Sequence, residues 1–327
     1  MKMRTWKKLM AGTVVSLFAC GMVLTAFADE AATEEEIVRE DDEEDYTTGD
    51  ASLDNPRNQD EIGEKELLVV SFGTSFNDSR RNTIGAIENT LEEAFPEWSV
   101  RRAFTSQIII DHVEKRDGIH IDNVEEALER AIDNGVKTLL VQPTHLMTGY
   151  EYLELEEKLA GYADAFENIG LGTNLLDTDE DFEAVAQAIT AETASYDDGE
   201  TAIVFMGHGT EADSNGVYAK MQDILSAGGF ENYYIGTVEA VPSLDDVIAA
   251  IADKGYTKVV LEPLMVVAGD HANNDMAAED DPESWYSILT AEGYDVTCVL
   301  KGLGEIPAVR EIYAAHTKAL IESAMQQ

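Results

Sequence analysis

Three histidines and a glutamate stand at positions where chemistry could occur. His145, His208 and His271 each follow an apolar run typical of a buried β-strand. Glu239 follows a fourth such run. In open α/β sheets ligands bind just outside the carboxyl ends of the strands, so these side chains could converge on one site. Two imidazoles and a carboxylate, from His208, Glu239 and His271, would suit Co²⁺, Fe²⁺, Ni²⁺ or Zn²⁺.

Each of these segments also has a simpler interpretation. In Met206-Gly-His-Gly209 the two glycines let the backbone turn sharply, and a strand-ending turn with a structural histidine would explain them. The polar stretch 269–275 could orient metal ligands or be an ordinary polar loop. A local spacing such as His-x₃-His is absent from the sequence, and so are a glycine-rich phosphate loop and the serine of a hydrolase elbow.

Strands and helices alternate in the predicted order of elements. We expect strands at 67–71, 100–104, 136–141, 202–206, 233–238 and 294–300, and a further strand before His271. We expect helices at 79–95, 108–115, 122–134, 150–166, 179–193, 244–254, 281–292 and 305–325, with Asp78 or Ser79 capping the first and Asp122 the third. This alternation predicts mostly parallel sheets covered by helices on both faces.

The second half of the chain repeats the first. Residues 135–143 match residues 255–263 at an offset of 120, and the same register pairs Glu151 with His271. Upstream, Gly73-Thr74 matches Gly209-Thr210 at an offset of 136. An internal duplication of this length predicts an α/β protein of two similar lobes with a cleft between them.

The N-terminus has the pattern of a secretory signal. Basic residues occupy positions 2, 4, 7 and 8, an apolar stretch runs from 9 to 28, and Ala26-Phe-Ala28 fits the small-x-small cleavage rule. We expect cleavage after Ala28 and export to a periplasmic or other extracytoplasmic space; an uncleaved segment would be a membrane anchor, because it is close to spanning length. Cys20 lies in this segment, which leaves Cys298 without an intramolecular disulfide partner.

Composition limits the remaining possibilities. The 327 residues are 44% hydrophobic, enough for a sizeable core, and carry a net charge of −43, which argues against binding to nucleic acid or to anionic membranes. We predict a signal peptide at 1–28, an acidic disordered leader at 29–61, an N-terminal α/β lobe at 62–196 and a C-terminal α/β lobe with the metal site at 197–327. A homo-oligomer is compatible with the sequence.

Several motifs together resemble one known family. In chain order they are Leu68-Val-Val-Ser-Phe-Gly-Thr-Ser75, Arg102-Ala-Phe-Thr-Ser106, Arg116-Asp-Gly-Ile119, Met206-Gly-His-Gly209 and Ala268-Gly-Asp-His-Ala272. They resemble the anaerobic-type sirohydrochlorin cobaltochelatases of cobalamin biosynthesis, which belong with the ferrochelatase-like class II chelatases. The resemblance extends from about residue 66 to the C-terminus.

The resemblance implies a two-lobed fold with a tetrapyrrole cleft and insertion of Co²⁺ into sirohydrochlorin without a nucleotide. His208 and His271 would be the metal-binding histidines and Glu239 the acidic ligand. Glu151 matches an acidic residue proposed to help proton movement, and His145 would have a supporting role. The metal is then a substrate, and Fe²⁺, Ni²⁺ or Zn²⁺ could replace Co²⁺.

The predicted export leaves other functions open, because cobalamin precursors are made in the cytoplasm. One alternative is an extracytoplasmic binding protein that captures a metal, haem or another tetrapyrrole in the same cleft without turnover. Another is an acidic structural or interaction protein that has lost its activity.

Overall fold

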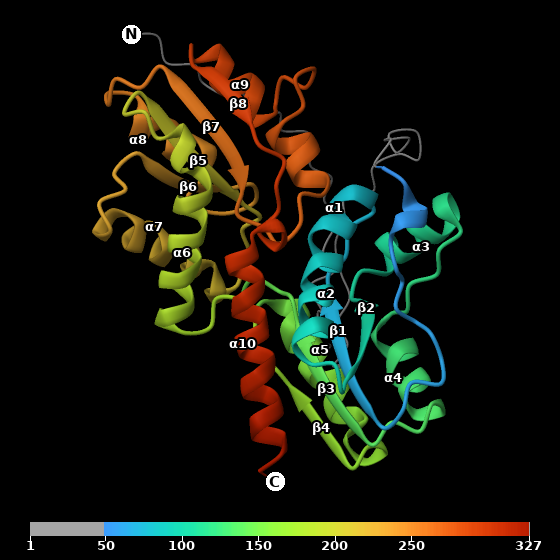
Figure 1. The fold of residues 1–327 in the computed structure, drawn as a ribbon. Helices are drawn as coiled ribbons and strands as arrows, with labels where there is room; N and C mark the ends of the chain where they lie inside the picture. The colour runs from blue at the N-terminus through green and yellow to red at the C-terminus, as the bar shows by residue number, and fades with distance from the viewer. Residues whose placement is uncertain (1–48, 327) are drawn as a thin grey trace, which may run out of the picture. The chain divides into compact units, whose positions relative to one another are not determined.

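The computed structural model describes residues 49–326. The predicted signal at 1–28 and the leader as far as residue 48 lie outside these residues. Figure 1 shows two parallel sheets, each flanked by helices. Among the described residues, no helix is long and apolar enough to cross a membrane.

Each sheet has four parallel strands. The first has the order β2-β1-β3-β4 and the second the order β6-β5-β7-β8. The strands of the first sheet are β1 (Lys65–Ser71), β2 (Ser99–Phe104), β3 (Thr138–Pro143) and β4 (Asn168–Leu171). Those of the second are β5 (Thr201–Gly207), β6 (Tyr233–Thr237), β7 (Lys258–Pro263) and β8 (Asp295–Cys298).

The strand register confirms the internal duplication. Lys65 of β1 lies opposite Thr138 of β3, and Thr201 of β5 lies opposite Lys258 of β7. These are the pairs that the two sequence offsets predict. The fold class predicted from the sequence, two similar lobes with mostly parallel sheets, is therefore confirmed.

Helices cover both faces of each sheet. The helices are α1 (Asn77–Asn82), α2 (Ile84–Ala94), α3 (Gln107–Asp117), α4 (Val124–Asp133), α5 (Tyr150–Gly161), α6 (Asp179–Thr193), α7 (Gly216–Ala227), α8 (Leu244–Ile251), α9 (Trp285–Ala291) and α10 (Pro307–Ala324). Alternate strand residues point to opposite faces, so Leu68 and Val70 of β1 pack on α4 and α5, whereas Leu67 and Val69 pack toward α2 and α10. In the second sheet α8 and α9 cover one face, and α6 and α7 the other.

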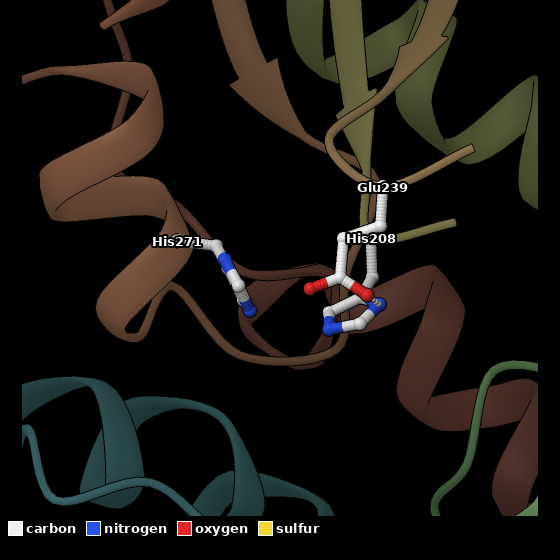
Figure 2. A group of neighbouring side chains, drawn as sticks. All are labelled: His208, Glu239 and His271. Atoms are coloured by element: carbon white, nitrogen blue, oxygen red, sulfur yellow. Dashed lines mark ion pairs between the residues drawn. The ribbon is translucent and has the colours of Figure 1, made fainter. Parts of the chain in front are cut away.

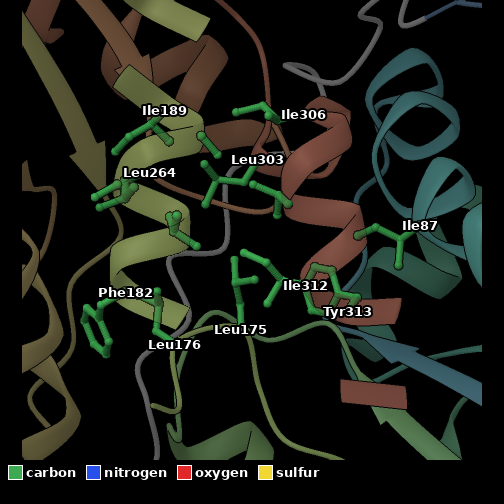
Figure 3. Packing of buried hydrophobic residues seen from close by; sticks show 14 of the residues in the cluster. Ile87, Leu175, Leu176, Phe182, Ile189, Leu264, Leu303, Ile306, Ile312 and Tyr313 are labelled. Atoms are coloured by element: carbon green, nitrogen blue, oxygen red, sulfur yellow. The ribbon is translucent and has the colours of Figure 1, made fainter. Parts of the chain in front are cut away.

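The last helix joins the two sheets. Although α10 follows the second sheet in the chain, it packs on α2, α6, β3 and β4. Tyr313 donates its hydroxyl proton to the Thr144 carbonyl (2.8 Å), which lies just after β3. Figure 3 shows Phe182 and Ile189 of α6 in the same apolar cluster as Ile312 and Tyr313 of α10. Helix α10, from the predicted C-terminal lobe (197–327), thus packs on elements of the predicted N-terminal lobe (62–196). The limits of the two lobes remain a prediction.

The structure differs from the predicted elements in a few places. The short strand β4 and the helix α7 were not predicted. The predicted helix at 79–95 is interrupted at Thr83, and α1 begins after Phe76 rather than after Asp78 or Ser79. The predicted cap Asp122 is wrong because its carboxylate pairs with Arg130, and the neighbouring Asn123 caps α4 instead.

Residues 49–61, the N-terminal strap, are held by buried ion pairs rather than disordered as predicted. The Asp54 side chain is only 3% exposed and accepts from Arg80 Nε and Arg102 Nη1, both at 2.7 Å. Arg102 also pairs with Glu88 at 2.8 Å. Burial alone would raise the pKa of Asp54, but the two guanidinium groups outweigh it and lower that pKa. The strap therefore completes the charge balance of a buried cluster.

Replacing Asp54 with alanine should lower the free energy of unfolding by about 3–5 kcal/mol, because it removes one partner from buried charges. Urea unfolding followed by circular dichroism would measure the change. Asp60→Ala is the matched control, since Asp60 lies on the same strap and pairs with an arginine (Arg130) in solvent. Equal midpoints for wild type and Asp54→Ala would contradict a stabilising role of the strap.

Candidate metal centre

Three neighbouring strands bring the predicted ligands to one edge of the second sheet. β5 pairs in parallel with both β6 and β7, so their carboxyl ends lie together. His208 directly follows β5, Glu239 follows β6, and His271 lies on the segment after β7. The topology alone thus explains how side chains from three distant parts of the sequence meet.

Two glycines at the end of β5 make room for neighbouring groups. Gly209 has a φ of +90°, and a Cβ on it would lie 2.8 Å from the Ala240 nitrogen. A Cβ on Gly207 would collide with the Tyr218 ring. The Glu239 backbone N–H donates to the His208 carbonyl (2.9 Å), which places the two side chains next to each other. Both glycines are therefore required by the approach of other groups and not only by the turn.

His208, Glu239 and His271 form a cluster (Figure 2). One possible ligand atom from each lies within 4.8 Å of those of the other two. The imidazoles stand edge to face with ring centroids 4.6 Å apart, and His208 Nδ1 lies 3.7 Å from Glu239 Oε2. The side chains of His208, Glu239 and His271 are 45%, 51% and 31% exposed, so the cluster is open to a substrate.

Hydrogen bonds orient both imidazoles. His208 Nδ1 lies 2.8 Å from the Gly209 carbonyl, which can only accept, so this nitrogen carries a proton. His271 Nδ1 lies 2.7 Å from Asp275 Oδ2. Burial lowers the pKa of His271, but the hydrogen bond to Asp275 and the nearby carboxylates outweigh it, and the net shift is upward. In both rings Nε2 is left as the atom that can bind a metal.

This arrangement can hold a divalent cation without enclosing it. Donors bound at about 2.1 Å to one ion lie at most about 4.2 Å apart, so small side-chain rotations suffice for all three to bind. Structural metal sites usually have four protein ligands, whereas three ligands leave coordination positions for another molecule. The site chemistry therefore favours delivery or catalysis over a structural role for the ion.

His145 and Glu151 lie at the carboxyl edge of the first sheet and are not part of this cluster. His145 follows β3 on the segment that leads to α5, and Glu151 lies in the first turn of α5. Within the described part of the chain, neither ring nitrogen of His145 has a hydrogen-bond partner, although both are buried. Burial lowers the pKa of His145 to about 4, against the opposing charge of Glu151. A buried imidazole without partners is costly, which suggests a role in function.

A second group of possible metal ligands has a structural role instead. His120, Asp122 and Glu126 also lie within reach of one ion. However, Asp122 is bound by Arg130 through two bonds of 2.6 and 2.9 Å, and Glu126 accepts from the Asn123 backbone in the cap of α4. The guanidinium group would repel a cation at this position.

Sequence reasoning missed two residues that support the centre. Tyr218 of α7 accepts a hydrogen bond from the Gly209 N–H (3.2 Å) and so holds the turn that carries His208. The spacing of Tyr218, Met221 and Leu225 is helical and could have indicated α7. Ser79, from the first half, accepts from the Ala268 N–H (3.0 Å) just before the His271 segment, a contact between distant residues that no local pattern reveals.

The fold is one found in chelatases. SirB from Bacillus subtilis, solved with Fe³⁺, superimposes with a TM-score of 0.57 over 81% of this chain and 98% of its own, at 14% identity. Two parallel sheets, each flanked by helices, thus give the chain a chelatase-like fold. The cobalt chelatase (CbiK) family model matches residues 65–322, and the chain belongs to this family.

Two curated relatives agree with this assignment. The sirohydrochlorin cobaltochelatase of Salmonella typhimurium is 38% identical over 263 residues, which cover 80% of this chain and 98% of the relative. The sirohydrochlorin cobaltochelatase CbiKC of Nitratidesulfovibrio vulgaris is 30% identical over 279 residues, covering 83% and 96%. The resemblance seen in the motifs is therefore confirmed over nearly the whole described chain.

The low pKa of His145 predicts a specific dependence of stability on pH. The unfolded chain binds a proton near pH 6.5, whereas the folded protein keeps the ring neutral down to about pH 4. The free energy of unfolding should therefore fall as pH decreases from 6.5 to 4, by at most about 1.4 kcal/mol per pH unit from this residue. Urea unfolding of wild type and His145→Gln at several pH values would measure this.

In this experiment the curve of His145→Gln should fall less steeply below pH 6.5 than that of wild type. His120→Gln, which changes an exposed ring, serves as the control and should retain the wild-type slope. Parallel curves for wild type and His145→Gln would mean that the ring at position 145 is not kept neutral by burial.

Proposed function

We propose that this chain is a sirohydrochlorin cobaltochelatase that inserts Co²⁺ into its tetrapyrrole without a nucleotide. The observation that carries the proposal is the convergence of His208, Glu239 and His271 on one open site in a chain of the cobalt chelatase family. Co²⁺ is the proposed physiological metal; imidazole and carboxylate donors would also accept Fe²⁺, Ni²⁺ or Zn²⁺. The net charge of −43 makes nucleic acid an unsuitable partner.

The three ligands would replace part of the hydration shell of Co²⁺ and hold the ion at the edge of the second sheet. Their partial exposure leaves one side of the ion open to the macrocycle. Pyrrole nitrogens can then replace the protein ligands one at a time, so the ion is never stripped of all its donors at once. A site that prefers a distorted macrocycle to the flat product would favour this exchange and product release.

Insertion also requires the removal of two pyrrole N–H protons, and we assign this step to His145 and Glu151. A neutral imidazole can accept a proton at one nitrogen and release one from the other. Because burial keeps His145 neutral, its ring suits the transfer of a proton rather than its storage. Glu151, at the first turn of α5, is the proposed acceptor that passes the proton to solvent.

The chelatase proposal predicts that His208→Ala and His271→Ala each lower kcat/KM for Co²⁺ insertion by at least about 100-fold, or about 2.7 kcal/mol, since each removes one of three ligands. Glu239→Gln should lower it less, because the amide oxygen can still bind but carries no charge. An anaerobic absorbance assay with sirohydrochlorin and Co²⁺ would measure the rates. His120→Ala, remote from the site in sequence and paired elsewhere, should keep the wild-type rate.

The number of turnovers separates catalysis from simple binding. Excess sirohydrochlorin and Co²⁺ should give many product molecules per protein chain. Uptake that stops at one equivalent of metal or tetrapyrrole would support a binding protein instead. Wild-type rates in both histidine variants would refute the assignment of the site.

We further propose that the protein is exported, on the strength of its signal-like N-terminus. N-terminal sequencing of the protein isolated from its native cell should find Asp29 as the first residue, because cleavage is expected after Ala28. An intact Met1 on the isolated protein would contradict cleavage. A substrate made in the cytoplasm would then have to reach the enzyme outside it.

A further inference from the structure

The strongest unassigned feature of the metal centre is the hydrogen bond between His271 and Asp275. Asp275 Oδ2 lies 2.7 Å from His271 Nδ1, and the two side chains are 28% and 31% exposed. This distance is that of a charge-assisted hydrogen bond from an imidazole N–H to a carboxylate. The bond fixes the tautomer of the ring and leaves the Nε2 lone pair for a ligand.

A single wide turn carries both residues. His271 is the N-cap of a π-helical turn, Ala272–Met276, which contains Asp275. Asn273 Nδ2 donates to the Gly269 carbonyl (2.7 Å), so the start of the turn is held by its own side chain. Such π-turns occur frequently at functional sites. The geometry of the turn, rather than a distant contact, places the carboxylate behind the histidine.

The two histidines of the centre are oriented by unequal acceptors. His208 donates to the Gly209 carbonyl, a neutral acceptor, whereas His271 donates to a carboxylate. A carboxylate behind a metal-binding histidine makes the imidazole a better donor and fixes its orientation. The two rings should therefore differ in how strongly they hold an ion.

We propose that Asp275 is a positioning residue that makes His271 the stronger of the two histidine ligands and thereby sets the affinity for the incoming Co²⁺. His208 and Glu239, which are more exposed, then release the ion first to the macrocycle. The inference rests on the proposed function in one respect, that the cluster of His208, Glu239 and His271 binds a metal.

Equilibrium binding of Co²⁺ to the full chain, without tetrapyrrole, tests the role of Asp275. Calorimetry or competition with a chromophoric chelator should show that Asp275→Ala raises the Kd about 10- to 100-fold. Asp275→Asn should lie between wild type and Asp275→Ala, because its amide oxygen accepts the same N–H without the charge. The visible absorption bands of bound Co²⁺ should change in Asp275→Ala, since the ring is no longer held in one orientation.

Asp270→Asn is the matched control. Asp270 is the residue before His271, but its Oδ1 accepts from Asn274 (2.6 Å), and the amide of Asn can accept in the same way. This variant removes a nearby charge and keeps the hydrogen bond to His271, so its Kd should stay within about threefold of wild type. Circular dichroism verifies that the variants fold.

Kinetics add a measurement that a general loss of structure would not reproduce. Asp275→Ala should raise the KM for Co²⁺ and leave the KM for sirohydrochlorin unchanged.

A wild-type Kd in Asp275→Ala, or an equal loss of affinity in Asp270→Asn, overturns the proposal. If Asp275→Ala weakens Co²⁺ binding but the wild-type protein does not turn over sirohydrochlorin, the role of Asp275 stands and the chelatase function fails. If wild type does not bind Co²⁺, both are wrong.

Discussion

The parallel pairing of β5 with β6 on one side and β7 on the other is the constraint on which the metal centre depends. It places three strand ends at one edge of the second sheet, so that His208, Glu239 and His271 meet although they are far apart in sequence. The approach is close enough that Gly209 has no room for a side chain beside Ala240, and the Tyr218 ring likewise fills the space at Gly207. The site therefore follows from backbone geometry first, and the ligand types decide what it binds.

The two repeats differ at the positions of the proposed histidine ligands. At the sequence offsets of the repeat, Phe72 occupies the position of His208, and Glu151 that of His271. The first half instead has His145 and Glu151 at its strand edge, the residues to which we assign proton transfer. The two repeats have thus diverged at their strand edges, and α10 packs the two sheets into one continuous core.

Local sequence patterns predicted the secondary-structure elements that depend on neighbouring residues. Apolar runs identified the central strands and the repeat gave their pairing, but β4 is short and half-exposed, so its four residues lack the apolar signal. The three ligands could be chosen as residues that follow strands; their mutual distances could not, because these depend on loop geometry. That the N-terminal strap is ordered could not be predicted either, since Asp54 pairs with arginines that lie 26 and 48 residues away in the sequence.

The exposure of the centre has a consequence for how the protein uses a metal. A storage protein gains from enclosing its ion, because each additional ligand and each excluded water slows release. Here the three proposed ligands are between 31% and 51% exposed, and His208 is oriented by a neutral backbone carbonyl. The proposed site would therefore orient an ion and still let it exchange ligands. Four pyrrole nitrogens compete well against three protein donors, so transfer to the macrocycle is favoured by the number of bonds gained.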